Sequence, residues 1–411
     1  MSRSSPGYAG AVSTTKKKIA VLHILAHLTA WDGISAILDV LFRGLDPDRF
    51  RLGICTLTER EDEVLDAFRS PAIELFALGR SAHAFDPATT GAVLSVLRRF
   101  RADIVHTHRN KGNYHGRVAG RLAGNVRIVT THHDMKDARF SPHAYAREAM
   151  RRDEREVHDS PPDFAARCLY PWLNVRMNRW NDRVIAVSQA CRDLHAPDPD
   201  DPRFEIVHAP FDELAFRPEH HRGSGAGCVL GSVGRLNSPK GHRHLVEAMK
   251  KVIAIRPEAR LSIIGEGPCR KDLERLIRAG GLAPRVELRG ALPHGIAMHE
   301  GIDILVHPSI SEGGCALAVL EAMGSGLPVI MSDLRSLREI FEDVPDPPAV
   351  FVPPADPAAL ADAIVRLLDN PARATAIGLE ASRHVHRHFT SRIHVERMTR
   401  LYEKLAEPRS S

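Results

Sequence analysis

Short runs of β-branched and other apolar residues alternate with longer stretches of helical spacing along most of this 411-residue chain. In the first half, the runs predicted to form strands are residues 19–25, 52–57, 73–78, 104–108, 128–132 and 184–188. Each run is too short and too continuously apolar for a half-exposed hairpin strand, and segments with helical spacing, such as 34–45 and 89–100, separate most of them. The pattern predicts a parallel β-sheet with crossover helices.

A second series of the same kind follows a break between Asp212 and Gly227, where Pro, Gly, Ser and charged residues crowd together as in an interdomain linker. Its predicted strands are residues 228–233, 261–264, 286–289, 304–307, 329–331 and 350–352, with helices expected at 244–255, 315–323 and 358–368. The length suits about two domains of roughly 150–200 residues. We expect two α/β domains facing a ligand cleft, because open parallel sheets bind ligands beyond the carboxyl ends of their strands.

Composition narrows the class of protein. With 43% hydrophobic and 26% charged residues the chain is globular, and its net charge of +5 is too small to predict a nucleic-acid partner. The six cysteines form no C-x-x-C pair, which argues against a zinc site or a disulfide framework and favours a reducing cytoplasm. Residues 1–15 lack the apolar core of a signal peptide, and no run approaches about 18 apolar residues. We therefore expect a cytoplasmic protein with at most peripheral membrane contact.

The strongest local motif is GSVGRLNSPKGHRHL, which begins at Gly231 and consists of a strand, a loop bracketed by glycines and a helix. Arg235 and Lys240 lie in the loop, where backbone N–H groups and the helix N-terminus already favour an anion. A diphosphate is the natural ligand. The spacing matches neither a Walker loop nor G-x-G-x-x-G, and a solvated basic turn explains the motif equally well when it is taken alone.

The second motif is HPSISEGGCALAVLEAMGSGLPVIM, which begins at His307. It places Glu312 in a loop after a strand and Glu321 on the following helix, so that both carboxylates can face one cleft. Carboxylates accept paired hydroxyl protons and so suit the vicinal diols of a sugar and a ribose. The alternative is that Glu321 only caps or solvates its helix, although its apolar neighbours favour a cleft-facing side chain.

Taken in order, these motifs resemble those of the retaining glycosyltransferases of family 4. The resemblance rests on V-G-R-L-x-x-x-K-G, G-x-G-P from Gly265, L-x-G from Leu288, P-S-x-S-E-G from Pro308 and L-E-A-M from Leu320. The N-terminal half adds D-I-V-H-T-H, T-x-H-D at 131–134 and A-V-S at 186–188. Together they cover residues 18 to 405. The resemblance implies the GT-B fold, in which two Rossmann-like domains face a central cleft and a C-terminal helix returns to the N-terminal domain.

On this basis we expect a flexible tail at 1–17, an N-terminal domain on the acceptor side at 18–212 and a linker at 213–227. A nucleotide-sugar-binding domain at 228–388 and a C-terminal helix at 389–411 complete the chain. Apolar residues at helical spacing in 391–405 support this last helix.

The resemblance also assigns roles to individual residues. Arg235 and Lys240 would hold the donor diphosphate and stabilise the leaving group, Glu312 would bind donor-sugar hydroxyls and Glu321 the ribose. His133 matches the family's N-domain histidine near the reacting sugar. Further contacts to the donor or acceptor are implied at Gly33, Gly234, Gly290, Leu292, Gly314 and Cys315.

Three departures from the family pattern stand out. The two acidic residues are nine positions apart instead of eight, so that Gly313 occupies the expected position of Glu312. We retain Glu312, because it follows Pro308 by four as the motif requires and a pair of glycines can absorb one extra residue. The usual N-G-[IV]-D near the hinge is replaced by A-P-F-D at 209–212, and Trp31 and Asp32 stand where the family often has paired glycines, so that they would shape an unusual acceptor pocket.

Two further features stand apart from these motifs. Residues 135–182 carry no strand pattern but many arginines with Tyr and Trp, which suits a plain surface excursion, an acceptor-binding element or a membrane-docking segment. His106, His108, His132 and His133 end two adjacent predicted strands. A metal is not predicted there, because no Asp or Cys completes a ligand set and GT-B transferases use cationic side chains and helix dipoles instead.

We therefore expect transfer of a sugar from a nucleoside diphosphate sugar to an acceptor hydroxyl, with retention of configuration and without a cofactor. A UDP-sugar, such as UDP-GlcNAc or a UDP-hexose, is favoured by its frequency in the family alone. The alternatives are a GT-B sugar-nucleotide epimerase and a catalytically silent binding homologue. The acceptor and the oligomeric state are left open by the sequence.

Overall fold

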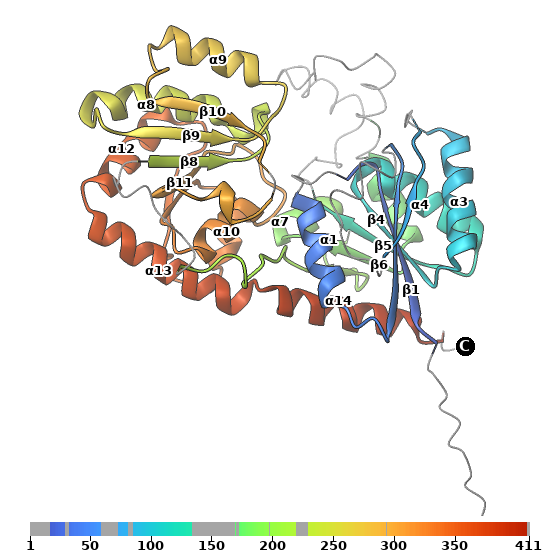
Figure 1. The fold of residues 1–411 in the computed structure, drawn as a ribbon. Coiled ribbons are helices and arrows are strands. Elements are labelled where there is room, and N and C mark those ends of the chain that lie inside the picture. Colours follow the sequence, from blue (N-terminus) through green and yellow to red (C-terminus); the bar gives the residue numbers. More distant parts are fainter. Residues whose placement is uncertain are drawn as a thin grey trace, which may run out of the picture.

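The computed structural model describes residues 17–28, 33–58, 73–80, 85–133, 169, 172–196, 198–218, 229–292 and 294–408. Residues 1–16 of the expected tail, Trp31 and Asp32, and most of the 135–182 excursion and of the 213–227 linker lie outside the described residues. The two-domain α/β architecture expected from the sequence is confirmed (Figure 1).

The first domain is built on a seven-stranded, wholly parallel sheet in the order β3-β2-β1-β4-β5-β6-β7. Its strands are β1 (Ile19–Leu25), β2 (Phe50–Thr56), β3 (Ile73–Ala77), β4 (Ile104–His108), β5 (Arg127–His132), β6 (Arg183–Ala186) and β7 (Phe204–Ile206). The helices described between them are α1 (Gly33–Gly44), α3 (Pro87–Phe100), α4 (Arg109–Ala123), the 3-10 turn η1 (Asn178–Trp180) and α7 (Gln189–His195).

The second domain repeats the plan with a six-stranded parallel sheet in the order β10-β9-β8-β11-β12-β13. Its strands are β8 (Val229–Val233), β9 (Arg260–Ile264), β10 (Val286–Gly290), β11 (Ile304–His307), β12 (Val329–Ser332) and β13 (Val350–Val352). Its longer helices are α8 (His242–Ile255), α9 (Arg270–Ala279), α10 (Leu317–Gly324), α12 (Pro357–Leu368) and α13 (Pro371–His388). Shorter turns are η3 (Ser238–Lys240), η4 (Ile296–Met298), α11 (Arg335–Arg338) and η5 (Glu339–Phe341).

Local sequence signals account for several helix starts. Asp86 accepts hydrogen bonds from the N–H groups of Ala88 and Thr89 ahead of α3, and Asp356 caps α12 in the same manner. In both helices a proline follows the capping aspartate, where its missing N–H costs nothing and its fixed φ suits the first turn. These caps fix where the crossover helices leave the sheet.

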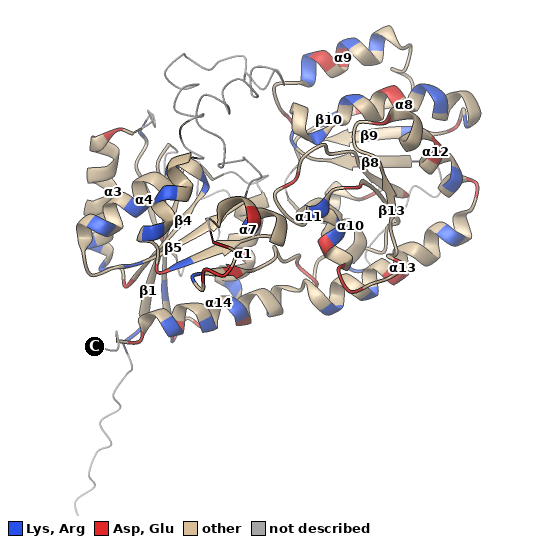
Figure 2. Ribbon diagram, turned by 180° about the vertical axis from the view of Figure 1, so that it is seen from behind, with Lys and Arg blue, Asp and Glu red and all other residues tan. Residues whose placement is uncertain are grey.

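Each sheet is covered by helices on both faces, so that its strands are buried on both sides. In the first domain α1 packs on one face and α3 with α4 on the other, and alternate strand residues point into the two cores. In the second domain α8, α9 and α12 cover one face while α10 and α13 cover the other. Lys, Arg, Asp and Glu are spread over the helices of both domains, in keeping with the small net charge of +5 (Figure 2).

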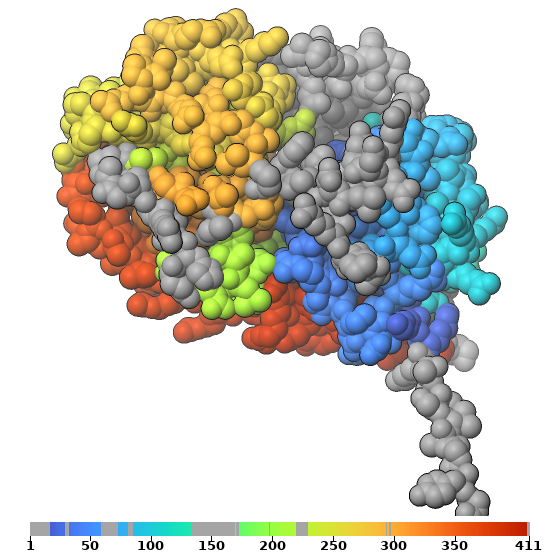
Figure 3. Space-filling model, viewed as in Figure 1, coloured from blue at the N-terminus to red at the C-terminus, as the bar shows by residue number. Residues whose placement is uncertain are grey.

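The C-terminal helix α14 (Ser391–Ala406) follows the second domain in the sequence but packs on the first domain, as expected. The polypeptide returns from the second domain to the first beside the linker, where the N–H of Phe211 donates to the carbonyl of Phe389 at 3.0 Å. Within the first domain, the side chain of Tyr402 is fully buried against the sheet. The two domains lie side by side, with α13 below the second domain and α14 below the first (Figure 1), and the space-filling view shows the same two lobes (Figure 3). Among the described helices, none has the length and apolar content needed to cross a bilayer.

Candidate active site between the two domains

Two helix N-termini meet where the domains face each other. Gly33 is the first residue of α1, which follows β1, and Leu317 is the first residue of α10, which follows β11. A Cβ atom added at Gly33 would lie only 3.8 Å from Leu317 Cδ2. Because the N-terminus of a helix carries a partial positive charge, this is a place suited to an anion shared by both domains.

A pocket with a volume of about 160 Å³ opens beside this point. Helix α1, the linker, the loop after β10 and helix α10 all contribute to its wall, so it is a true interdomain pocket. The described lining residues are Ala36, Asp39, Val40, Arg43, Pro210, Phe211, Asp212, Ala215, Phe216, His294, Gly295, Leu317 and Glu321. Of the residues singled out from the sequence, Glu321 lines this pocket.

The basic loop after β8 is held against the loop after β11. Gly241 ends the loop with φ of 67°, and a Cβ atom there would come within 2.0 Å of the carbonyl oxygen of Pro308, so that glycine is required. The N–H of Ile310 donates to the carbonyl of Pro239 at 2.8 Å. The sequence motifs that carry Lys240 and Glu312 are therefore packed together in space.

Glu312 is held by three donors at one oxygen. Its Oε1 lies 2.6 Å from Lys240 Nζ, 2.8 Å from His307 Nε2 and 2.6 Å from Ser309 Oγ. Burial would raise the pKa of Glu312, but the charge of Lys240 and the hydrogen bond from His307 hold this pKa well below its ordinary value. Glu312 is thus a fixed, ionised carboxylate that compensates the positive charge of Lys240.

Arg235 lies in the same loop as Lys240 but is exposed. The loop is anchored by the N–H of Leu236, which donates to the carbonyl of Glu266 at 2.9 Å. A Cβ atom at Gly265 would come within 2.0 Å of the carbonyl oxygen of Gly234, so that the G-x-G-P motif lets two loops approach closely. The anchored loop leaves Arg235 at the surface of the second domain.

Glu321 lies on the second turn of α10 with 1% of its surface exposed. Its Oε1 is 2.6 Å from His294 Nε2 and its Oε2 is 3.6 Å from His299 Nε2, while both imidazoles pack edge-on against the ring of Phe216. Burial opposes its ionisation, but the charge of His294 lowers the pKa of Glu321 below its ordinary value. In the same way burial lowers the pKa of His294 and Glu321 raises it, with a net increase.

The extra glycine of the acidic motif lies at a contact between the domains. Ser188, in the loop after β6, donates from Oγ to the carbonyl of Gly313 at 2.7 Å. A Cβ atom at Gly314 would come within 2.7 Å of Val187 Cγ2, so a side chain there would collide with the first domain. The loop that carries Glu312 is therefore shaped by the first domain as well as by its own.

A second interdomain contact lies beside it. The carboxylate of Glu339 accepts hydrogen bonds from the N–H groups of Gln189 and Ala190, at 2.6 and 2.8 Å, and so caps the start of α7. Arg335 Nη1 lies 2.7 Å from Asp193 Oδ2 on the same helix. These contacts join α11 and η5 of the second domain to α7 of the first.

The helix that was predicted to begin at Cys315 begins two residues later in the structure. Helix α10 starts at Leu317 with Ala316 as its N-cap, so the backbone at Cys315 precedes the helix. The thiol is buried, with Sγ 3.9 Å from His208 Nδ1, and burial raises its pKa. Any amide donors for an anion thus come from the start of α10, not from a helical turn at Cys315.

The loop after β10 carries the expected base-binding residues. The carbonyl of Gly290 accepts a hydrogen bond from the N–H of Gly265 at 2.8 Å, at a register shift in β10. Leu292 packs against the apolar cluster that includes Phe211 and Phe216, next to the pocket wall. The structure therefore places this loop between the G-x-G-P motif and the interdomain pocket.

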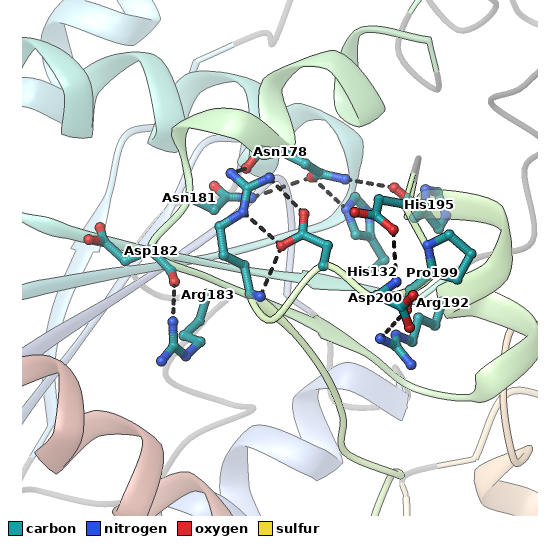
Figure 4. Close-up of polar contacts among 12 residues, drawn as sticks. His132, Asn178, Asn181, Asp182, Arg183, Arg192, His195, Pro199 and Asp200 are labelled. Carbon is teal, nitrogen blue, oxygen red and sulfur yellow. Dashed lines mark hydrogen bonds and ion pairs between the residues drawn. The ribbon is translucent and has the colours of Figure 1, made fainter.

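The histidines at the ends of β4 and β5 divide into two groups instead of forming one cluster. His132 Nε2 is 3.0 Å from Asn178 Oδ1, and its ring stacks on that of His195 with centroids 4.0 Å apart (Figure 4). His133 follows β5, and its Nε2 lies 3.2 Å from His108 Nδ1. The division follows from the strand period of two, since His132 points to the other face of the sheet from His106 and His108.

Some residues of this site carry no signal in the sequence. His294 and His299 are recruited to Glu321 from a loop with no recognisable motif, and His307 and Ser309 are recruited to Glu312. Only the position of His307 and Ser309 inside the acidic motif could have drawn attention to them. The partner of each carboxylate is decided by packing.

Comparison with known proteins agrees with this geometry. Residues 31–213 match the family described as Glycosyltransferase Family 4, and residues 227–370 match Glycosyl transferases group 1. The chain is 33% identical over 292 residues to the 2-deoxystreptamine glucosyltransferase of Streptomyces kanamyceticus, covering 68% of this chain and 71% of that protein. It is 25% identical over 344 residues to an Escherichia coli UDP-Gal:alpha-D-GlcNAc-diphosphoundecaprenol alpha-1,3-galactosyltransferase, covering 79% and 82%.

Solved structures share the fold at low sequence identity. HepE from Anabaena, solved with UDP and glucose, superposes with a TM-score of 0.72 and 17% identity, covering 94% of this chain and 100% of that one. The sucrose-phosphate synthase of Thermosynechococcus elongatus superposes with a TM-score of 0.74 and 20% identity, covering 95% and 99%. The architecture is thus that of GT-B glycosyltransferases, and the chain belongs to glycosyltransferase family 4.

Proposed function

We propose that the protein is a retaining glycosyltransferase that moves a sugar from a UDP-sugar to an acceptor hydroxyl. The observation that carries this proposal is the meeting of the α1 and α10 N-termini at Gly33 and Leu317, beside a pocket that holds Glu321. A diphosphate placed at this meeting point would be attracted by the partial positive charges of helix N-termini from both domains. The attached nucleoside would then extend toward the pocket.

Each half of the donor has matching groups in this arrangement. The buried carboxylate of Glu321 suits the paired hydroxyls of a ribose, and the fixed carboxylate of Glu312 suits hydroxyls of the donor sugar. Arg235 would reach the diphosphate from the exposed rim of its loop. His133, at the carboxyl end of β5, would approach the sugar from the acceptor side.

The reaction balances without a metal. The bond between the anomeric carbon and the diphosphate oxygen breaks, and the acceptor oxygen forms a bond to the same face of that carbon. The acceptor proton passes to an oxygen of the leaving diphosphate, whose growing charge is offset by Arg235, Lys240 and the two helix N-termini. We propose this front-face route, in which no protein nucleophile takes part and no cofactor is required.

Support for a UDP-sugar comes from relatives. The similar Escherichia coli enzyme is named for UDP-Gal, and the similar HepE structures were solved with UDP and with UDP-glucose. A UDP-hexose or UDP-GlcNAc is accordingly the donor that we propose. The names of relatives differ in their acceptors, so the acceptor is specified here only as a hydroxyl.

Incubation with radiolabelled UDP-, GDP- and ADP-sugars, with and without a panel of hydroxyl acceptors, tests the proposal. We expect transfer from a UDP-sugar, with the anomeric configuration of the product, measured by NMR, equal to that of the donor. Interconversion of the donor sugar without an acceptor would show an epimerase instead. Tight binding of nucleotide without turnover of any donor would show a silent binding homologue.

A further inference from the structure

A continuous chain of buried polar contacts runs from His133 into the first domain. His108 Nδ1 lies 3.2 Å from His133 Nε2, and His23 Nδ1 lies 3.0 Å from His108 Nε2. The other nitrogen of His23, Nε2, lies 3.4 Å from the hydroxyl of Tyr402. The carboxyl end of β5 is thereby connected to the C-terminal helix α14.

The chain continues beyond Tyr402 and then ends. The Tyr402 hydroxyl lies 2.7 Å from His106 Nδ1, and His106 Nε2 lies 2.7 Å from Thr131 Oγ1. His23, His106 and Tyr402 have at most 2% of their surface exposed. Among the residues that the structure describes, Thr131 Oγ1 has no second hydrogen-bond partner. The hydroxyl of Thr131 is therefore the end of this series of hydrogen bonds.

Burial keeps His23, His106, His108 and Tyr402 uncharged. It lowers the pKa of His23 to about 3 and those of His106 and His108 well below their ordinary value. It also raises the pKa of Tyr402 well above that of an exposed phenol. At neutral pH each of these three imidazoles therefore has one N–H and one bare nitrogen, and the phenol has one proton.

These proton counts impose a direction on the chain. A neutral imidazole that uses both nitrogens must donate on one side and accept on the other, and a phenol between two imidazoles uses its proton only when it donates to one of them. If the protons pointed away from His133, the proton of Thr131 would have no acceptor. The order that uses every proton starts at Thr131, which donates to His106, and passes through Tyr402 and His23 to His108.

We propose that Tyr402 and His23 are positioning residues for His133, because this directed chain makes His108 donate from Nδ1 to Nε2 of His133. The proton of neutral His133 then resides on its Nδ1. The proposal rests on the proposed role of His133 beside the reacting sugar. The orientation of His133 is then set from α14, the helix that joins the second domain back to the first.

A metal ion is the rival use of the same histidines. One ring nitrogen from each of His23, His106 and His108 lies within 4.8 Å of the others. A divalent cation would take the lone pairs that the hydrogen bonds use. It would also bring two charges into a core where, among the described residues, no carboxylate contacts these three histidines. The hydrogen-bonded chain needs no such compensation, and for this reason we favour it.

Long-range ¹H–¹⁵N NMR on the full chain with ¹⁵N-labelled histidine tests the proposal without reference to activity. The His133 signals are assigned by their loss in His133→Gln. In the unsubstituted protein we expect His133 to be neutral and protonated at Nδ1. In Tyr402→Phe, which keeps the ring and removes only the hydroxyl, we expect both tautomers of His133 to appear.

Kinetics on the same variants provide a second measurement. Tyr402→Phe should lower kcat by about tenfold and change the donor KM by less than about twofold, because orientation and not donor binding is lost. Thr131→Val, which removes the terminal donor, should act in the same direction. Tyr114→Phe removes a phenol from outside the chain and is the matched control, expected to leave the His133 signals and kcat unchanged.

Three results would overturn the proposal. They are a His133 protonated at Nε2 in the unsubstituted protein, a His133 tautomer that Tyr402→Phe and Thr131→Val leave unaltered, and one equivalent of tightly bound metal in the purified protein. Should Tyr402→Phe fail to fold, the unsubstituted protein and Thr131→Val still decide the question. Full activity of His133→Gln would refute the proposed role of His133 in transfer, whereas the tautomer measurement would still report on the chain.

Discussion

Lys240 and Glu312 form an ion pair with Nζ 2.6 Å from Oε1, although 72 positions separate them in the chain. The two residues come from the basic loop after β8 and the acidic loop after β11. From the sequence they were predicted to contact the donor independently of each other. Their pairing makes the charge of each depend on the other. A single substitution in this pair should therefore affect stability as well as chemistry.

Glu312→Gln should weaken sugar transfer strongly while sparing the binding of bare nucleoside diphosphate. The amide cannot balance Lys240, and it cannot accept hydroxyl protons at both of its terminal atoms. Calorimetry with UDP and steady-state kinetics with the UDP-sugar separate the two effects. An equal loss of UDP affinity in Glu312→Gln and in Glu321→Gln would show that the two carboxylates do not divide sugar and ribose between them.

The same variant should show a characteristic pH dependence of stability. Lys240 and His307 depress the pKa of Glu312 in the folded protein, so its contribution is fully present above its unfolded value of 4.5 and is lost as the pH falls below it. The difference in unfolding free energy between the parent and Glu312→Gln should be constant from pH 6 to 8. Below 4.5 it should shrink by up to about 1.4 kcal/mol per pH unit, as measured by urea unfolding. A difference that grows on acidification would contradict the pairing.

Arg235→Ala and Lys240→Ala should each reduce kcat by about a hundredfold or more, because both cations are proposed to act on the charge that develops on the leaving diphosphate. Arg243→Ala is the matched control, since this arginine lies on α8 just beyond the same loop and is 67% exposed in its side chain. Its turnover should stay near that of the parent. Near-parental turnover in both test variants would dismiss the proposed clamp.

His294→Gln should destabilise the protein more at pH 6 than at pH 9. Glu321 raises the pKa of His294 despite burial, so the stabilising pair is fully present below the unfolded value of 6.5 and is lost as the pH rises through the raised folded value. Unfolding by urea at the two pH values measures this. A destabilisation of equal size at both pH values would mean that the imidazole acts by packing alone.

Deletion of Gly313 restores the family's spacing of eight but should lower both activity and melting temperature. The carbonyl of Gly313 accepts the hydrogen bond from Ser188 Oγ, and Gly314 must fit closely against Val187 of the first domain. Shortening the loop would pull Glu312 away from Lys240 or break this interdomain contact. A deletion variant with parental kinetics and stability would show that the extra residue is merely accommodated.

Activity should survive removal of divalent metals. The two helix N-termini and the side chains of Arg235 and Lys240 are proposed to supply the positive charge that the leaving diphosphate needs. Turnover after EDTA treatment and desalting should equal that of untreated protein. A loss that manganese or magnesium restores would assign that role to a metal and would reopen the question of its ligands.

Much of the fold was predictable because buried parallel strands have continuous runs of apolar residues. The strands at 19–25, 104–108, 304–307 and 350–352 were predicted with the bounds that the structure has. Short apolar runs of this kind are typical of strands that are buried on both faces of a sheet. The three-residue strand β7 (Phe204–Ile206) was missed, because the exposed Glu205 interrupts its apolar residues, whereas the equally short strand 350–352 is apolar throughout. Helix α10 begins two residues later than predicted, since its start is decided by contacts of the preceding loop with Val187 and His208.

What the sequence by itself determined was the identity of the motif-bearing loops and their order, because turn chemistry and hydrophobic period are local properties of the chain. Only the tertiary structure decided which side chains meet. Lys240 was paired with Glu312, Glu321 with His294, and His133 with a chain that ends at Thr131 and includes Tyr402. Such pairings depend on side chains brought together across sheets and domains, and a buried charge or imidazole takes whatever partner the packing provides, since leaving it unpaired costs more free energy.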